Sequence, residues 1–331
     1  MDKVRIGIIG CGGIANGKHM PSLKKLADVE MAAFCDIIVE RAEKAAKEYG
    51  TPDARVYTDY KELLKEKDID VVHVLTPNKQ HSFITVDALE AGKHVMCEKP
   101  MAINSAEAKK MLDAAKRTGK KLTIGYQSRF RQDSMYLKKV CENGELGDIY
   151  YARAQAIRRR AVPTWGVFLD AENQGGGPLI DIGTHALDLT LWEMNNYEPA
   201  MVTGSTFRKL ADHENPANAW GPWDPKKFTV EDSAFGMVTM ENGAAIIEAL
   251  FLWRYFAGGR KRSTCHIGIV VFLLLIVWET VSTDLKLTHP VLIPNPENVF
   301  AVFPARWEEL LKNVTSSMIL LAEGFITSLI A

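Results

Sequence analysis

The sequence of 331 residues has few cysteines, no excess of charge of one sign and no signal-peptide pattern in its first residues. It has no CxxC pair and no His/Cys spacing of the kind that binds metal, so we expect reduced thiols and no metal site. A net charge of −1 gives no electrostatic reason to expect nucleic acid as a partner. Without a leader, residues 1–250 are expected in the cytoplasm. The five scattered cysteines are Cys11, Cys35, Cys97, Cys141 and Cys265.

The first apolar strand pattern, residues 4–9, runs into the turn Gly10-Cys11-Gly12-Gly13-Ile14-Ala15. This is the GxGxxA pattern of dinucleotide-binding proteins: the first glycine makes the turn and the second admits a pyrophosphate to the backbone. A helix that begins near Gly13 would offer free N–H groups to the phosphates. The pattern predicts that Gly10, Gly12, Gly13 and Ile14 bind the cofactor.

The second strand, residues 29–35, ends at Asp36. An acidic residue about 20 positions after the glycines suits a ribose 2′-hydroxyl and would repel a 2′-phosphate, so NAD is favoured over NADP. The alternative is that Asp36 only caps a helix over residues 39–49.

Strands and helices continue to alternate as far as residue 125. This alternation predicts a doubly wound parallel sheet, a Rossmann domain over residues 1–125. Thr76, Pro77, Asn78 and His81 follow a buried strand and are expected to line the cofactor crevice. The further predicted strands are 55–57, 69–75, 94–97 and 121–125, and the further helices 60–67, 82–91 and 105–118.

Glu98-Lys99-Pro100 follows the strand over residues 94–97. A residue before proline is pushed into an extended conformation, so Lys99 projects from the carboxyl end of its strand, where open parallel sheets bind ligands. The alternative is a surface lysine in a loop.

A second pattern begins at residue 126, with a helix over 133–142 and strands over 148–157, 201–207, 233–240 and 244–250. Between them lies Gly175-Gly176-Gly177-Pro178-Leu179-Ile180-Asp181-Ile182-Gly183-Thr184-His185. Asp181 and His185 are four apart and share a face if this stretch is helical, which suits a general acid/base site. A capped helix with a buried, satisfied histidine is equally compatible with the spacing.

The GxGxxA turn, Glu98-Lys99-Pro100 and the glycine-rich segment that ends at His185 resemble the three signatures of the Gfo/Idh/MocA oxidoreductases. The resemblance implies an α/β substrate domain with an open, mostly antiparallel sheet over residues 126–250, shorter here than in the family. It also implies NAD-dependent hydride transfer from a sugar or polyol.

The resemblance further implies roles for individual residues. Lys99 would donate a hydrogen bond to the reacting hydroxyl, His185 would act as general acid/base and Asp181 would orient His185 or a sugar hydroxyl. Glu98 would lie at the cofactor, and Tyr126, Arg129 and Trp165 would approach the substrate. Residues 158–160, all arginines, and Trp165 could reach hydroxyls or a carboxylate, or could belong to a solvated loop; we slightly favour the loop.

Because the superfamily also includes regulatory proteins, a non-catalytic dinucleotide- or sugar-binding sensor is the alternative function. The presence of Lys99 together with His185 favours an enzyme. The resemblance also implies association into homo-oligomers through the open face of the second sheet, which is expected to be incomplete in this chain.

Uninterrupted apolar runs are absent except over residues 267–278. We expect a transmembrane helix over 264–282, preceded by Arg260, Lys261 and Arg262 on the cytoplasmic side, with a buried core helix as the alternative. Residues 260–331 resemble the start of an ABC-transporter permease of the nitrate/sulfonate/taurine type, with a second helix, 313–331, cut short. Residues 251–331 would then be an unrelated piece joined by fusion, deletion or assembly error, and a non-functional chimera is the third possibility.

Overall fold

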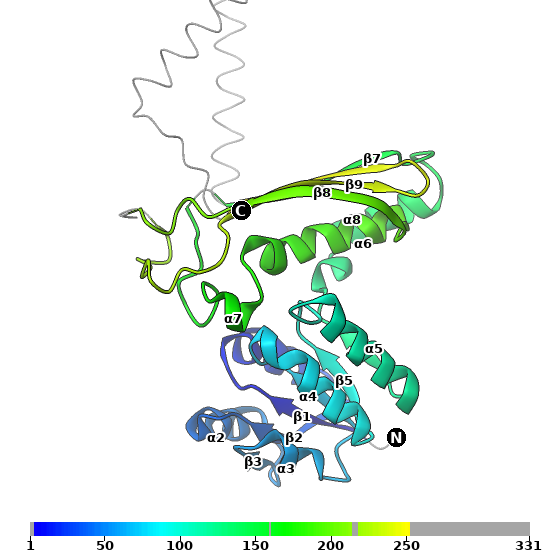
Figure 1. The fold of residues 1–331 in the computed structure, drawn as a ribbon. Coiled ribbons are helices and arrows are strands. Elements are labelled where there is room, and N and C mark those ends of the chain that lie inside the picture. Colours follow the sequence, from blue (N-terminus) through cyan, green and yellow to red (C-terminus); the bar gives the residue numbers. More distant parts are fainter. Residues whose placement is uncertain (1–2, 159, 214–217, 252–331) are drawn as a thin grey trace, which may run out of the picture. The chain divides into compact units, whose positions relative to one another are not determined.

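The computed structural model describes residues 3–251, except residues 159 and 214–217 (Figure 1). The segment expected to resemble a permease (260–331), the expected span 264–282 and the expected helix 313–331 lie outside this part of the chain. Within it, no helix is both long and apolar enough to cross a membrane.

The N-terminal half contains a six-stranded sheet in which every pair of neighbouring strands is parallel. The strand order is β3-β2-β1-β4-β5-β6: β2 and β3 are added on one side of β1, and β4, β5 and β6 on the other. The position between β1 and β4 is thus a topological switch point, which is where open α/β sheets bind ligands. The predicted doubly wound parallel sheet is therefore confirmed. Its strands are β1 (Val4–Ile9), β2 (Val29–Cys35), β3 (Arg55–Tyr57), β4 (Val71–Val74), β5 (His94–Cys97) and β6 (Leu122–Ile124).

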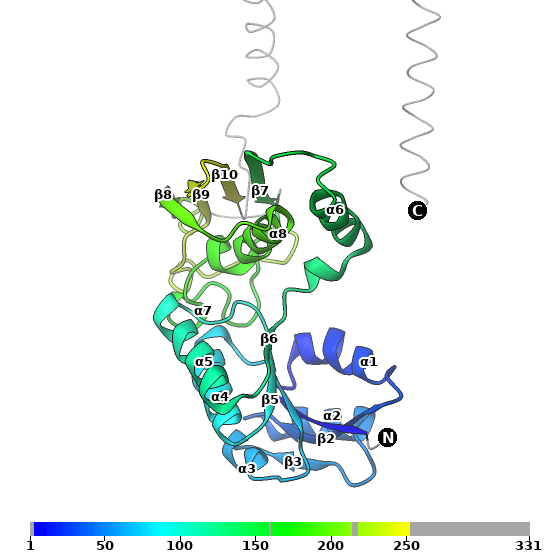
Figure 2. The ribbon, with the colours of Figure 1, turned by 90° about the vertical axis from the view of Figure 1, so that its right-hand side faces the viewer.

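Helices cover both faces of this sheet, as Figure 2 shows for α4 and α1 on the two sides of β5. Successive side chains of β1 point to opposite faces of the sheet, so Ile8 packs in the core on one face and Ile9 in the core on the other. One face carries α3 (Tyr60–Leu64), α4 (Asn78–Glu90) and α5 (Ser105–Thr118), and the other η1 (Ala15–His19), α1 (Met20–Leu23) and α2 (Val39–Tyr49).

The helix predicted over residues 82–91 begins earlier, at Asn78. Pro77 occupies the N-cap, a position that tolerates proline because the first N–H groups of a helix have no intrahelical partner. The polar residues that follow Pro77 hide the helical period from the sequence. Asn78 and His81 therefore lie in the first turns of α4 and not in a loop.

The second sheet has the order β7-β10-β9-β8, in which β7 and β10 are parallel and the other pairs antiparallel. This agrees with the predicted open, mostly antiparallel sheet. Helix α8 (Thr184–Met194) packs one face through Ala186, Leu187 and Leu191, and every residue of β8 is exposed. The strands are β7 (Tyr151–Ile157), β8 (Pro199–Phe207), β9 (Ser233–Met240) and β10 (Ala245–Phe251); the remaining helices are η2 (Gln127–Phe130), α6 (Gln132–Glu142), α7 (Ala171–Gln174) and η3 (Leu179–Gly183).

Cys11, Cys35 and Cys97 are free and buried, as predicted. Burial raises the pKa of each thiol to about 12. They are therefore protonated and act as small apolar groups of the core.

Candidate active site

An ion pair joins the segment after β5 to the turn before α8. Lys99 Nζ lies 2.8 Å from Asp181 Oδ1 and donates a second hydrogen bond of 3.2 Å to the main-chain oxygen of Asp181. The two side chains are only 17% and 10% exposed. Two of the motifs singled out in the sequence, 82 residues apart, thus meet in one partly buried site.

The turn that carries Asp181 is η3, a π-helical turn, and is held by a residue that the sequence did not reveal. The Glu231 carboxylate accepts hydrogen bonds from the N–H groups of Gly177 (2.8 Å) and Leu179 (3.2 Å). A Cβ at position 177 would lie 1.9 Å from the main-chain oxygen of Glu231, so this approach requires glycine. Glu231 therefore positions Asp181 through the backbone.

His185 lies in the first turn of α8, edge-on to the Tyr126 ring at 6.4 Å between centroids. Its Nδ1 is buried and has no hydrogen-bond partner among the described residues. Burial, followed by the charge of Lys99, lowers the pKa of His185. A neutral imidazole with an unpartnered nitrogen differs from the satisfied core histidine that the spacing alone allowed.

The expected contact in which Asp181 orients His185 is not among the hydrogen bonds of the described residues. The intervening π turn breaks the regular i,i+4 arrangement. The Asp181 carboxylate is turned instead to Lys99, with Oδ2 at 3.7 Å from Arg158 Nη2. The preference for Arg158 as a solvated loop residue is therefore wrong.

The Arg129 side chain forms hydrogen bonds with Asp188 on α8. Its Nε donates to Asp188 Oδ2 at 2.8 Å, and a second hydrogen bond joins Nη2 to Asp188 Oδ1. The guanidinium also lies 5.9 Å from the centre of the Tyr126 ring. In this arrangement Arg129 supports Tyr126, and a direct contact with substrate remains a prediction.

The turn after β1 has the shape that a dinucleotide requires. Gly10 has a φ of +93°, and a Cβ there would lie 2.7 Å from the main-chain oxygen of Leu75. At Gly12 and Gly13 a Cβ would meet nothing within 4 Å, so the backbone is open on that side. Thr76 Oγ1, at the neighbouring strand end, is buried and has no partner among the described residues. These features fit a bound dinucleotide, with Ile14 (41% exposed) and Pro77 also at this edge.

Asp36 holds this turn from the end of β2. Its Oδ2 accepts from Cys11 N and its Oδ1 from Ile38 N, both at 2.9 Å. The N-cap of α2 is Ile38, which has no side-chain cap, so the alternative that Asp36 only caps this helix is wrong.

Three other predicted cofactor residues are tied to protein groups. Asn78 Nδ2 donates to the main-chain oxygen of Gln174 at 2.9 Å. The two ring nitrogens of His81 lie 2.8 Å from the main-chain oxygens of Thr76 and Pro100. These side chains order the loops around the site, and direct cofactor contacts remain predictions.

Glu98 is the third of these residues. His19 Nε2 lies 2.7 Å from Glu98 Oε1, and the Lys99 N–H donates to Glu98 Oε2 at 3.0 Å. Burial works against the carboxylate, but the hydrogen bond from His19 and the charge of Lys99 hold the pKa of Glu98 below its usual range. Glu98 therefore fixes the backbone that presents Lys99.

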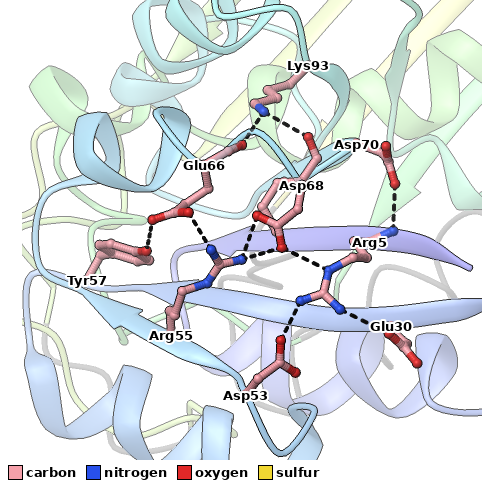
Figure 3. Close-up of polar contacts among 10 residues, drawn as sticks. Arg5, Glu30, Asp53, Arg55, Tyr57, Glu66, Asp68, Asp70 and Lys93 are labelled. Atoms are coloured by element: carbon pink, nitrogen blue, oxygen red, sulfur yellow. Dashed lines mark hydrogen bonds and ion pairs between the residues drawn. The ribbon is translucent and has the colours of Figure 1, made fainter.

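A second polar cluster lies at the amino ends of β1 and β3 (Figure 3). Arg5 and Arg55 both pair with Asp68, and Tyr57 donates to Glu66. Cofactors bind at the other, carboxyl, end of such strands, so this cluster is structural.

Comparison with known proteins identifies both halves of the chain. Residues 4–126 match the family described as "Oxidoreductase family, NAD-binding Rossmann fold", and residues 134–265 match the GFO/IDH/MocA C-terminal domain. The chain is 40% identical over 243 residues to a D-glucoside 3-dehydrogenase of Escherichia coli K12, covering 73% of this chain and 68% of that protein. It is 29% identical to an inositol 2-dehydrogenase of Salmonella paratyphi B, covering 58% and 55%.

Solved structures show the same architecture. An oxidoreductase domain protein from Kribbella flavida superimposes with a TM-score of 0.66 at 29% identity, covering 78% of this chain and 69% of that one. An aldose-aldose oxidoreductase from Caulobacter crescentus gives 0.64 at 28% identity, covering 76% and 71%. With both domains matched and a 40% identical relative, the chain belongs to the Gfo/Idh/MocA family of oxidoreductases.

Proposed function

We propose that this chain is an NAD-dependent dehydrogenase that oxidises a ring hydroxyl of a sugar, with a glucoside oxidised at its 3-hydroxyl as the favoured substrate. The observation that carries the proposal is the Lys99–Asp181 ion pair beside His185, whose Nδ1 has no hydrogen-bond partner in the described part of the chain. The 40% identity to a D-glucoside 3-dehydrogenase supports the choice of substrate.

The open turn at Gly10, Gly12 and Gly13 would hold the cofactor, with Ile14 and Thr76 beside it. Asp36 supports NAD over NADP because a carboxylate repels a 2′-phosphate. When bound, NAD supplies the hydride acceptor.

The chain's own residues handle the proton. Lys99 Nζ donates to the substrate hydroxyl oxygen, and the Asp181 carboxylate holds the ammonium group in position. His185 is neutral at physiological pH because its pKa is lowered, and it takes the hydroxyl proton. Tyr126 packs against the His185 ring and limits the approach of water.

The sensor alternative rests on the same cofactor turn but has no use for the ion pair and the unpartnered histidine. The comparisons do not support the chimera alternative: the match to the C-terminal domain of the family extends to residue 265, past the join expected near residue 250.

The test is reduction of NAD or NADP by the purified chain with a panel of sugars and glycosides, in the wild type and in Lys99→Ala. We expect turnover with NAD and a glucoside, and a loss of at least about 100-fold in kcat in the variant. The dissociation constant of NAD should stay within about twofold, which calorimetry measures. Lys109→Ala, an exposed lysine on α5, is the control. Near-full activity of Lys99→Ala would show that the lysine is not catalytic, and NAD binding without turnover of any sugar would favour the sensor.

A further inference from the structure

Two connections of the second domain enclose a small core of their own. Val162, Ala211, Trp223, Phe228 and Val230 form a cluster of buried side chains separate from the core under the sheet. Because Val162 follows β7 and the other four residues precede β9, these two connections pack against each other through buried side chains.

Hydrogen bonds join the same two connections. The Val162 N–H donates to Asn218 Oδ1 at 2.9 Å, and Asn218 Nδ2 donates back to the Val162 oxygen at 3.0 Å. A backbone hydrogen bond of 2.8 Å runs from Ala219 N to Arg160 O. These contacts fix the backbone on both sides of the aromatic residues considered next.

Trp165 and Trp220 lie on these fixed connections but do not contribute to the core beneath them. Their ring centroids are 4.7 Å apart with an interplanar angle of 79°, and Phe168 lies 5.6 Å from Trp165. The two tryptophans are 50% and 42% exposed. The chain therefore holds an aromatic surface open to solvent.

Arg158 connects this aromatic pair to the catalytic ion pair. Its guanidinium carbon lies 5.5 Å from the centre of the Trp220 ring, and its Nη2 lies 3.7 Å from Asp181 Oδ2. Its Nη1 is buried and has no hydrogen-bond partner among the described residues. Trp220 is thus one side chain away from Asp181, with an unsatisfied donor between them.

We propose that Trp165, Trp220 and Arg158 form a subsite for a second pyranose ring, attached to the sugar that is oxidised at Lys99 and His185. The apolar C–H face of a pyranose packs against an aromatic ring, and its hydroxyl groups hydrogen-bond to the partly exposed guanidinium of Arg158. An aromatic aglycone would use the rings but offers fewer oxygen acceptors to the guanidinium of Arg158 than a sugar does. The inference deepens the proposed function and rests on it for the first ring.

The test compares cellobiose with methyl β-D-glucoside, which share the first ring and differ in the second. Binding is measured by calorimetry and turnover by NAD reduction, in the wild type, Trp220→Ala, Trp220→Phe and Tyr150→Ala. Tyr150 is the matched control because it is 79% exposed and precedes β7, whose far end leads to Arg158. We expect Trp220→Ala to weaken cellobiose binding at least about tenfold, to leave methyl glucoside within twofold, and Trp220→Phe to retain most of the affinity.

The proposal is wrong if the wild type binds cellobiose no more tightly than methyl glucoside, or if Trp220→Ala weakens both ligands equally. If phenyl β-D-glucoside binds more tightly than cellobiose, the surface binds an aromatic aglycone, and the proposal of a subsite for a second sugar ring is wrong. Trp220-dependent binding of cellobiose without turnover of any glucoside would refute the dehydrogenase and leave the subsite standing.

Discussion

The Lys99 ammonium and the Asp181 carboxylate lie 2.8 Å apart, and this partly buried pair joins the nucleotide-binding half of the chain to its second domain. Removing one partner of such a pair leaves an uncompensated charge in a poorly solvated place. The pair therefore fixes the position of the lysine for chemistry and also couples the two halves structurally.

The pH dependence of activity follows from His185. Because burial and Lys99 lower its pKa, we expect kcat/KM to rise with pH through a value below the ordinary 6.5 as the imidazole becomes a competent base. Titration of the His185 ring by NMR, assigned with His185→Gln, checks the value without activity. Lys99→Met should move this pKa upward, since it removes a nearby positive charge. A wild-type titration above 6.5 would contradict the burial of the ring.

Gly12→Ala separates cofactor binding from folding. A methyl group at this position meets no protein atom within 4 Å, so the melting temperature without cofactor should change little. It would enter the space predicted for the pyrophosphate, and we expect NAD to bind at least about tenfold more weakly. Calorimetry with NAD measures this. Gly17→Ala, equally unobstructed and one helical turn later, is the control. Unchanged affinity in Gly12→Ala would show that the phosphates do not approach this glycine.

Glu248 is a buried carboxyl on β10 whose Oε1 has no partner among the described residues. Burial raises its pKa from 4.5 to about 7. The folded protein keeps this proton where the unfolded chain has lost it, so the residue makes stability fall as pH rises between these two values. Glu248→Gln should therefore stabilise the protein at about pH 8, by roughly 2–4 kcal/mol, and change little at about pH 4. Denaturant unfolding at both pH values measures the difference. Glu43→Gln, exposed on α2, should show no such dependence.

Lys93 is a buried lysine of the polar cluster in Figure 3. It is 5% exposed, and its ammonium donates to the main-chain oxygens of Glu66 and Ile69. Lys93→Met keeps much of the volume but leaves two carbonyl groups without their donor, so we expect a loss of about 1–3 kcal/mol in unfolding free energy. Lys110→Met, on the exposed side of α5, should lose less than about 0.5 kcal/mol. Equal losses in the two variants would mean that these hydrogen bonds add nothing to stability.

Much of the Rossmann half could be predicted because its signals are local. The limits of α2 and α5 agree with the sequence pattern to the residue, since caps and apolar periods act over one or two turns. The start of α4 could not be predicted from the sequence, because the polar first turn after Pro77 carries no apolar period.

By itself, the sequence determined the alternation of strands and helices in the Rossmann domain, the glycine turn for a dinucleotide and the presence of Lys99, Asp181 and His185. Only the tertiary structure decided that Asp181 faces Lys99 and Arg158. It also decided that the Nδ1 of His185 has no partner among residues 3–251 as described, and that Glu231 holds the turn that carries Asp181. The reason is physical. Backbone preferences act between near neighbours, whereas Glu231 reaches Gly177 across 54 residues and Lys99 reaches Asp181 across 82, so their meeting depends on how the whole chain packs.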